Sequence, residues 1–241
     1  MARFFIGWDV GGWHCDHNPT SRDALVILDE ERRQVGLSWR GNLRSTINTC
    51  TTPRAWLETL FHLCQTEFSG SPTILSIDIP LAFPQAFTRL ITKSQPTAVP
   101  GPAGENPYLF RRCERLLFRH GLRPLSPVKD MIGSQATKGI HVLARYAPLP
   151  QSCGVWRDGT DRLTVIEAYP AGCKGSRLMR SLLAQSGVTT PLPSQDERDA
   201  LVCALTGWLF VRNRQSLLEP PDDSPLQEGW IWLPKDVLDP G

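Results

Sequence analysis

The chain has 241 residues, of which 41% are hydrophobic, and its formal net charge is only +2. Such a chain can bury one large core or two smaller ones, and its near-neutral charge points to no particular class of partner. Its seven cysteines form no CxxC pair and no apolar run reaches about 18 residues, which argues against a zinc ribbon and a membrane span and leads us to expect reduced thiols in the cytoplasm.

The first half of the chain predicts strands and one helix. The expected strands are apolar runs bounded by turn residues, and they lie at residues 4–10, 24–28, 34–39 and 73–79. Residues 29–33 are charged throughout and indicate a hairpin tip. Thr52 and Pro53 predict the start of a helix, because threonine is a good N-cap and proline a good first helical residue.

The second half alternates between helices and strands. Residues 94–107 are rich in Pro and Gly and predict a loop, and residues 95–150 as a whole are expected to form a loop and basic helical insert. The expected helices lie at residues 108–120, 134–146, 177–185 and 196–212, and the expected strands at residues 163–168 and 230–233. Hairpin strands followed by α/β units predict a single α/β domain, residues 1–241, with a mixed sheet.

Acidic residues recur where the apolar strands end. Asp9, Asp78 and Glu167 each lie near the end of an expected buried strand. Asp196 and Asp199 are three residues apart, so they share one face of a helix near its first turn. Sites in α/β proteins form outside the carboxyl ends of parallel strands, so these acids are expected to meet if the three strands are parallel neighbours.

Several carboxylates at one point repel one another unless a cation neutralises them. Oxygen ligands in that number suit Mg²⁺ or Mn²⁺, and two such ions about 4 Å apart can promote in-line cleavage of a phosphodiester. The alternative for each acid alone is a cap, a turn or a surface ion pair, and Asp196 is well placed as an N-cap. The cluster His14-Cys15-Asp16-His17 lacks a second ligand pair at zinc-finger spacing and indicates a polar turn.

Five segments carry a resemblance to a known family. They are GWDVGG at residues 7–12, SIDIPLAFP at 76–84, RRCERLLF at 111–118, IEAYPAGCKG at 166–175 and DERDALVCAL at 196–205, and the ending EGWIWLP at 228–234 matches as well. In this order and spacing they resemble the motif series of the family labelled domain of unknown function 429. That family is regarded as predicted nucleases of ribonuclease-H-like fold, and the helix motif is also similar to that of Holliday-junction resolvases.

The resemblance implies a fold, a cofactor and a set of catalytic residues. The order of elements fits a ribonuclease-H-like mixed five-stranded sheet with helices on both faces, plus a helical insert. Mg²⁺ or Mn²⁺ would be bound by Asp9, Asp78, Glu167 and Asp199, with Asp196 as an additional ligand. The chain departs from the family where many members have His-Pro-Glu, since it has Tyr169-Pro170-Ala171, and where an aspartate is often expected, since it has Glu114.

Basic residues dominate residues 108–145, where eight Lys and Arg accompany two Asp and Glu, a local charge of +6. Arginines position phosphates, so Arg111, Arg112 and Arg115 are expected to bind nucleic acid, DNA or RNA. Lys174 and Arg177, just after the Glu167 strand, are further substrate-binding candidates. The alternative is a solvated helix face.

Three functions fit these features. The favoured one is a divalent-metal-dependent nuclease that hydrolyses phosphodiester bonds of nucleic acid. One alternative is a non-catalytic nucleic-acid-binding or scaffold protein with the same fold, which loss of an acid would have favoured. The other is a nucleotide phosphotransferase of the actin and sugar-kinase type, and the absence of an internal repeat speaks against it, because such enzymes duplicate the fold.

Overall fold

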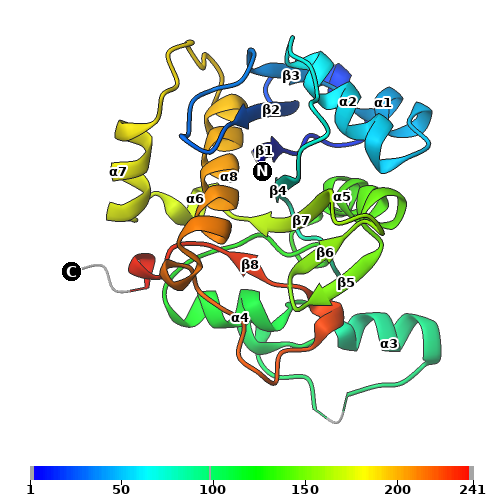
Figure 1. Cartoon of the computed structure of the whole chain (residues 1–241). Coiled ribbons are helices and arrows are strands. Elements are labelled where there is room, and N and C mark those ends of the chain that lie inside the picture. The colour runs from blue at the N-terminus through cyan, green and yellow to red at the C-terminus, as the bar shows by residue number, and fades with distance from the viewer. Residues whose placement is uncertain (1–2, 98, 239–241) are drawn as a thin grey trace.

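A computed structural model describes residues 3–97 and 99–238 of the chain (Figure 1). These residues form one mixed sheet in the order β3-β2-β1-β4-β7-β6-β5, and β8 also pairs with β7. The strands are β1 Phe4–Asp9, β2 Asp23–Leu28, β3 Trp39–Gly41, β4 Thr73–Asp78, β5 Leu149–Ser152, β6 Val155–Arg157, β7 Leu163–Ala168 and β8 Ile231–Trp232. The α/β class is confirmed, whereas the described sheet has eight strands and not five.

The strand directions bring the acidic strand ends to one edge of the sheet. β1 pairs in parallel with β4, β4 in parallel with β7, and β2 and β3 follow β1 as antiparallel neighbours. The register places Asp9 opposite Asp78 and Ile77 opposite Glu167. Three neighbouring parallel strands, β1, β4 and β7, therefore end side by side, which is the condition under which their terminal acids were expected to meet.

Helices cover both faces of this sheet (Figure 1). They are α1 Arg44–Thr49, α2 Pro53–Leu63, α3 Gln85–Lys93, α4 Arg112–Arg119, α5 Gly133–Tyr146, α6 Pro170–Cys173, α7 Arg177–Gln185 and α8 Gln195–Arg212. Alternate residues of a strand point to opposite faces. Ile6 of β1 accordingly packs in one apolar core with α2 and α5, and Phe5 packs in the other with α8, α7 and α4.

Gly7 explains how α8 can lie directly on the central strand. A Cβ atom at Gly7 would stand 1.8 Å from the carbonyl oxygen of Ala200 and 2.5 Å from the amide nitrogen of Ala204. Both are backbone atoms of α8, so no side-chain adjustment would relieve the clash. The first glycine of the GWDVGG segment thus sets the distance between β1 and the helix that carries Asp199.

The third strand lies later than expected. Residues 34–39 were predicted as a strand, but β3 covers only Trp39–Gly41. Gly36 has φ +72°, and the following Leu37 N–H donates to the carbonyl of Cys64 at 2.8 Å, so the chain turns away from β2 before it pairs again. The polar hairpin tip at residues 29–33 is confirmed by the Asp29 N–H bond to the Arg33 carbonyl at 3.0 Å.

The boundaries of the expected helices follow the sequence with one exception, and three helices, α1, α3 and α6, were not expected. Thr52 is the N-cap of α2, and its hydroxyl accepts from the Ala55 N–H at 3.1 Å, as predicted. The helix expected at residues 108–120 begins only at Arg112. The β5–β6 hairpin was not expected, since Pro150 resembles a loop residue; an exposed edge strand tolerates proline because its N–H side faces solvent.

All seven cysteines lie in the described residues and are free thiols, as the absence of paired spacings indicated. In the part of the chain that the structure describes, no helix has the length and apolar character needed to cross a membrane.

Candidate functional site

Asp9 and Asp78 form the centre of the candidate site. Asp9 ends β1, Asp78 ends β4, and the two are register partners on adjacent parallel strands. Such strands lie about 4.8 Å apart, so the two carboxylates leave the sheet side by side. Both line a cavity of about 390 Å³. Within residues 3–97 and 99–238, neither carboxylate accepts a hydrogen bond or pairs with a basic side chain.

The environment of this pair disfavours its negative charge. Burial, followed by the charge of Asp78, raises the pKa of Asp9 to about 9. Burial, followed by the charges of Asp199 and Glu167, raises the pKa of Asp78 to about 8. Desolvation and like charges act in the same direction here, and nothing opposes them. A cation between the two carboxylates would restore their ionised form.

Asp199 approaches the pair from α8. It is partly buried, burial raises its pKa, and its Oδ1 accepts from the side-chain amide of Gln195 at 2.8 Å. Its charge acts on both Asp9 and Asp78. Asp199 also borders a second cavity of about 580 Å³ with Lys174, whose charge partly offsets the rise in the pKa of Asp199. The three aspartates therefore form one electrostatic group, with Asp199 at its edge.

Glu167 lines the same cavity, but its carboxylate is already paired with Arg111. Arg111 donates to both of its oxygens, at 2.6 and 2.7 Å, and the Leu81 N–H donates to Oε2 at 2.9 Å. Arg111 is fully buried and also donates to Glu114 at 2.8 Å. The structure thus brings Glu167 to the cavity wall as one partner of a bidentate ion pair.

Asp196 is also paired with a basic side chain. Its Oδ2 accepts from Arg40 Nε at 2.7 Å and from the Arg22 N–H at 3.0 Å. The N-cap interpretation of Asp196 is wrong, because Ser194 holds that position and its hydroxyl accepts from the Glu197 N–H at 3.1 Å. Asp196 still contributes negative charge near Asp9.

A divalent metal requires several oxygen ligands that converge on one point. Among residues 3–97 and 99–238, no three His, Cys, Asp or Glu side chains converge into a complete metal-binding set. Asp9, Asp78 and Asp199 nevertheless offer the hard carboxylate oxygens that Mg²⁺ and Mn²⁺ prefer. Two of these carboxylates lack any partner in the described protein, and the pKa of each of the three is raised. Their donor chemistry suits such an ion, although the three carboxylates do not converge on one point in the described residues.

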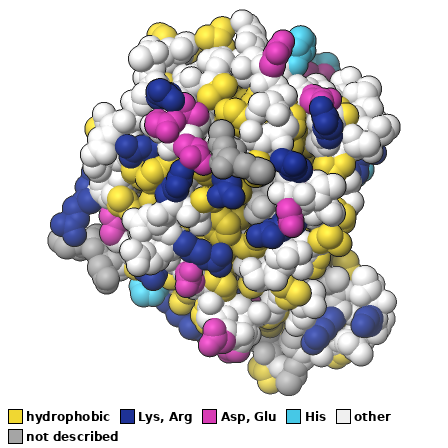
Figure 2. Space-filling model, viewed as in Figure 1, with side chains coloured by type: hydrophobic (Ala, Val, Ile, Leu, Met, Phe, Trp, Pro, Cys, Tyr) yellow, Lys and Arg dark blue, Asp and Glu magenta, His cyan; other side chains and the backbone are white. Residues whose placement is uncertain are grey.

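The basic residues expected to bind substrate lie in different places. Arg111 is buried in its ion pairs, and Arg112 makes a bidentate pair with Asp223 at 2.7 and 2.8 Å. Arg115 lines a separate cavity beside α3, and Arg177 is exposed at the start of α7. On the face seen in Figure 2, Lys and Arg side chains lie scattered among acidic ones. Of the five candidates, Lys174 is the one placed next to a site aspartate.

Besides the acids, three polar side chains line the cavity of Asp9 and Asp78, namely those of Arg123, Gln135 and Tyr169. Burial and then the charge of Asp78 raise the pKa of Tyr169, which places its phenol near that carboxylate. Tyr169 directly follows β7, so its position after a strand was a usable signal. Arg123 was one of eight basic residues in its stretch, and nothing distinguished Gln135.

No protein-family model, no curated protein and no solved structure matches this chain.

Proposed function

We propose that this chain is a divalent-metal-dependent hydrolase of phosphodiester bonds in nucleic acid. One observation carries the proposal: Asp9 and Asp78 end adjacent parallel strands side by side in a cavity, without a neutralising partner in the described residues. Uncompensated buried charge costs stability, so a protein retains it where it has a use. A phosphodiester carries negative charge itself, so a cation between these acids and the substrate would neutralise both.

The strand order supports the finer assignment of the fold. Three antiparallel strands, β3, β2 and β1, are followed by β4 and β7, both parallel to β1. This order is the one expected of a ribonuclease-H-like core, and α8 delivers Asp199 to its acidic edge. We assign β5, β6 and β8 to additions around that core. The same order and the six sequence segments support membership in the family labelled domain of unknown function 429.

Asp9, Asp78 and Asp199 would hold Mg²⁺ or Mn²⁺. When bound, such an ion polarises a phosphoryl oxygen and lowers the pKa of bound water. The aspartates keep the ion at the carboxyl ends of β1 and β4, where the cavity opens. Glu167 has a different task in this proposal, because Arg111 already neutralises it: the pair fixes β7 to the segment before α4 and so shapes the cavity wall.

The remaining cavity residues would act on the substrate. Arg123 supplies a positive charge for a phosphate next to the two carboxylates. Tyr169 and Gln135 offer hydrogen-bond donors on the cavity wall, and Lys174 offers a charge on the Asp199 side. A cavity of about 390 Å³ is within the usual range for a small ligand, so it is large enough for part of a nucleic acid chain.

The test is cleavage by the purified full chain in Mn²⁺, with single-stranded, duplex and branched DNA and with RNA as substrates. We expect cleavage of at least one substrate by the wild type, abolition by chelation, and none by Asp9→Asn or Asp78→Asn. Asp222→Asn is the matched control, because Asp222 is exposed and outside the cavity. Equal cleavage by wild type and both site variants, or no cleavage with Mn²⁺ bound to the wild type, would overturn the enzyme assignment; the second result would favour a binding protein.

A further inference from the structure

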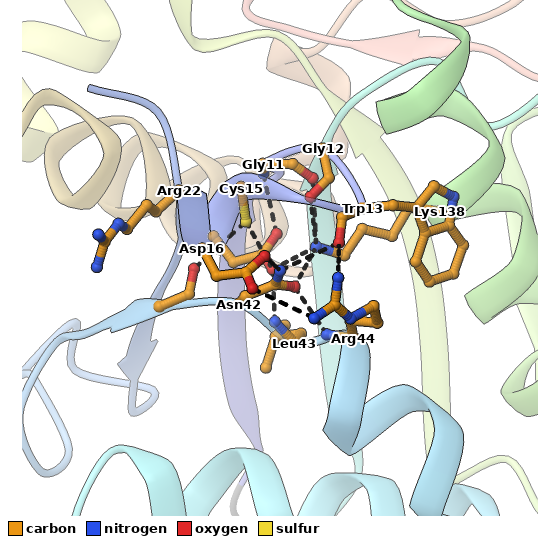
Figure 3. A network of polar contacts seen from close by, with 12 residues as sticks. Gly11, Gly12, Trp13, Cys15, Asp16, Arg22, Asn42, Leu43, Arg44 and Lys138 are labelled. Carbon is orange, nitrogen blue, oxygen red and sulfur yellow. Dashed lines mark hydrogen bonds and ion pairs between the residues drawn. The ribbon is translucent and has the colours of Figure 1, made fainter. Parts of the chain in front are cut away.

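Lys138 is a fully buried lysine that the proposed chemistry does not use. It lies on α5, and Figure 3 shows its side chain extending toward the turn formed by Gly11 and Gly12. Its ammonium group donates to the carbonyls of Gly11 at 3.2 Å and Gly12 at 3.4 Å, and to Asn42 Oδ1 at 3.3 Å. It also forms an ion pair with Asp23. A buried ammonium is costly unless it is paired, so the surrounding acceptors are essential to its position.

Asp23 holds the same turn from the other side. This fully buried carboxylate accepts from the Gly11 N–H at 2.9 Å, the Leu43 N–H at 2.6 Å and the indole N–H of Trp8 at 3.1 Å. Gly11 is therefore bound at both ends of its backbone, by Asp23 at its N–H and by Lys138 at its carbonyl. The ion pair and the turn form one buried polar unit.

The two glycines are what allow this close approach. A Cβ atom at Gly11 would lie 2.7 Å from Cys15 Cβ and 2.8 Å from the carbonyl carbon of Arg22. A Cβ atom at Gly12 would lie 3.1 Å from Ser134 Oγ, at the start of α5. The double glycine at the end of GWDVGG thus packs the turn against both β2 and α5.

Trp13 extends the contact between the turn and α5. Its backbone N–H donates to Ser134 Oγ at 3.2 Å, and its indole N–H donates to Thr137 Oγ1 at 3.1 Å. The same helix carries Gln135, one turn before Lys138, on the wall of the cavity that holds Asp9 and Asp78. Lys138 consequently joins two parts of the candidate site, the turn that begins two residues after Asp9 and the helix across the cavity.

We propose that Lys138, paired with Asp23, is a positioning residue that fixes the Gly11–Gly12 turn, and through it Asp9, relative to α5. The inference about metal rests on the proposed function, whereas the inference about the turn does not. A purely structural role would make Lys138 matter for stability alone. A positioning role requires that the turn loosens and the affinity for a divalent metal falls while the rest of the fold is unchanged.

The test uses the double variant Asp23→Asn/Lys138→Met, because Lys138→Met alone would leave a buried charge and unfold the chain. Replacing both partners removes both charges and keeps the volume, an exchange that buried ion pairs tolerate. With Asp23→Asn the oxygen in the Oδ1 position still accepts from the Gly11 N–H, whereas the amide nitrogen in the Oδ2 position cannot accept from the Leu43 N–H. Lys138→Met leaves the two glycine carbonyls without the ammonium group. Tyr146→Phe is the matched control: Tyr146 is buried at the other end of α5, and its hydroxyl donates to the carbonyls of Ile47 at 2.8 Å and Cys50 at 3.0 Å.

Two readouts decide the proposal, amide hydrogen exchange and Mn²⁺ titration by calorimetry. In the double variant we expect at least about ten-fold faster exchange of the amides at residues 10–14, with the sheet amides unchanged. We expect Mn²⁺ affinity to fall by about 10- to 100-fold, the loss typical of residues that orient metal ligands. Tyr146→Phe should change neither quantity.

Unchanged exchange at residues 10–14 in the double variant would overturn the proposal. So would wild-type Mn²⁺ affinity in that variant, because the turn would then have no influence on Asp9. If the wild type binds no Mn²⁺, the metal-dependent function we propose is wrong. The hydrogen exchange of the turn amides then decides by itself whether Lys138 fixes the turn.

Discussion

Two groups of acids lie next to each other in this molecule: Glu114 and Glu167 are buried and paired with a basic residue, whereas Asp9 and Asp78 are only partly buried and unpaired in the described residues. Glu114 and Glu167 share the guanidinium of Arg111, so both carboxylates are paired inside the protein, although its one positive charge offsets only one of their two negative charges. Asp9 and Asp78 have no such partner in the described residues. Arg111 pairs with the two glutamates, whereas Asp9 and Asp78 border a cavity. A cation from solvent could reach the two aspartates there. Under the proposed function, the contrast separates acids that stabilise the fold from acids that bind a cation.

Arg111→Met should have the largest effect on stability, because it removes the basic partner of Glu114 and Glu167. It would leave two buried carboxylates uncompensated, and losing one partner of a buried pair costs about 3–5 kcal/mol. We expect that loss in urea unfolding, or no folded protein. Arg112→Met is the control: its pair with Asp223 is exposed and its removal should cost less than about 1 kcal/mol. Equal costs for the two variants would contradict the distinction between the groups.

Asp78→Asn should act in the opposite direction on the open group. In the absence of metal it removes one of two carboxyl groups that the site disfavours in their ionised form, so the variant should be at least as stable as the wild type at neutral pH. With Mn²⁺ at about 100 times its dissociation constant, the wild type should gain about 2.7 kcal/mol and the variant far less. Thermal unfolding with and without Mn²⁺ measures both effects.

Glu167→Gln sharpens the same comparison. If Glu167 serves only as the ion-pair partner of Arg111, this variant should be less stable than the wild type but bind Mn²⁺ with the same affinity. A fall in affinity as large as that of Asp78→Asn would instead make Glu167 a metal ligand, as the sequence predicted.

The pH dependence of stability should reveal the open group directly. The pKa values of Asp9 and Asp78 are raised, to about 9 and about 8, so the folded state retains protons that the unfolded chain releases above its ordinary aspartate pKa. The contribution of these two groups to the free energy of unfolding is then complete below that ordinary pKa and is lost as the pH rises toward about 8 to 9. The slope is about 1.4 kcal/mol per pH unit for each proton retained.

Between about pH 6 and pH 8 we therefore expect the metal-free wild type to lose about 5 kcal/mol, because both aspartates retain a proton over most of the interval. Asp78→Asn should flatten the curve, and saturating Mn²⁺ should do the same, since metal displaces the retained protons. A wild-type curve that rises over this interval would mean that the two aspartates are already ionised and compensated.

The sequence predicted the parts of the site that depend on local pattern. Apolar runs ending in Asp9, Asp78 and Glu167 gave the strand ends, and their parallel pairing followed once the strands were neighbours. The pattern contained no information on partners, however. That Arg111 lies inside against Glu167, and Arg40 against Asp196, depends on contacts between residues 56 and 156 positions apart in the chain.

The same limit explains the errors in the fold. Gly36 turns the chain out of the third strand through a contact with Cys64, and the β5–β6 hairpin is held at the sheet edge by its pairing with β7. The local charge of +6 overstates the surface charge of this stretch for a similar reason, because Arg111 and Lys138 are both buried. Composition measures charge but not whether that charge reaches the surface.

The smallest effect we predict is on nucleic acid binding by two arginines, one at the cavity and one already in an ion pair. Arg123 lines the cavity of Asp9 and Asp78, whereas Arg112 is held by Asp223. Arg123→Gln should weaken nucleic acid binding and reduce the slope of log affinity against log salt by about 0.7–0.9, the value for one phosphate contact. Arg112→Gln should leave the slope unchanged. Fluorescence anisotropy in EDTA, which prevents cleavage, measures both. If Arg112→Gln lowers the slope and Arg123→Gln does not, the nucleic acid lies along α4, as the basic stretch predicted, and the cavity loses its place in substrate binding.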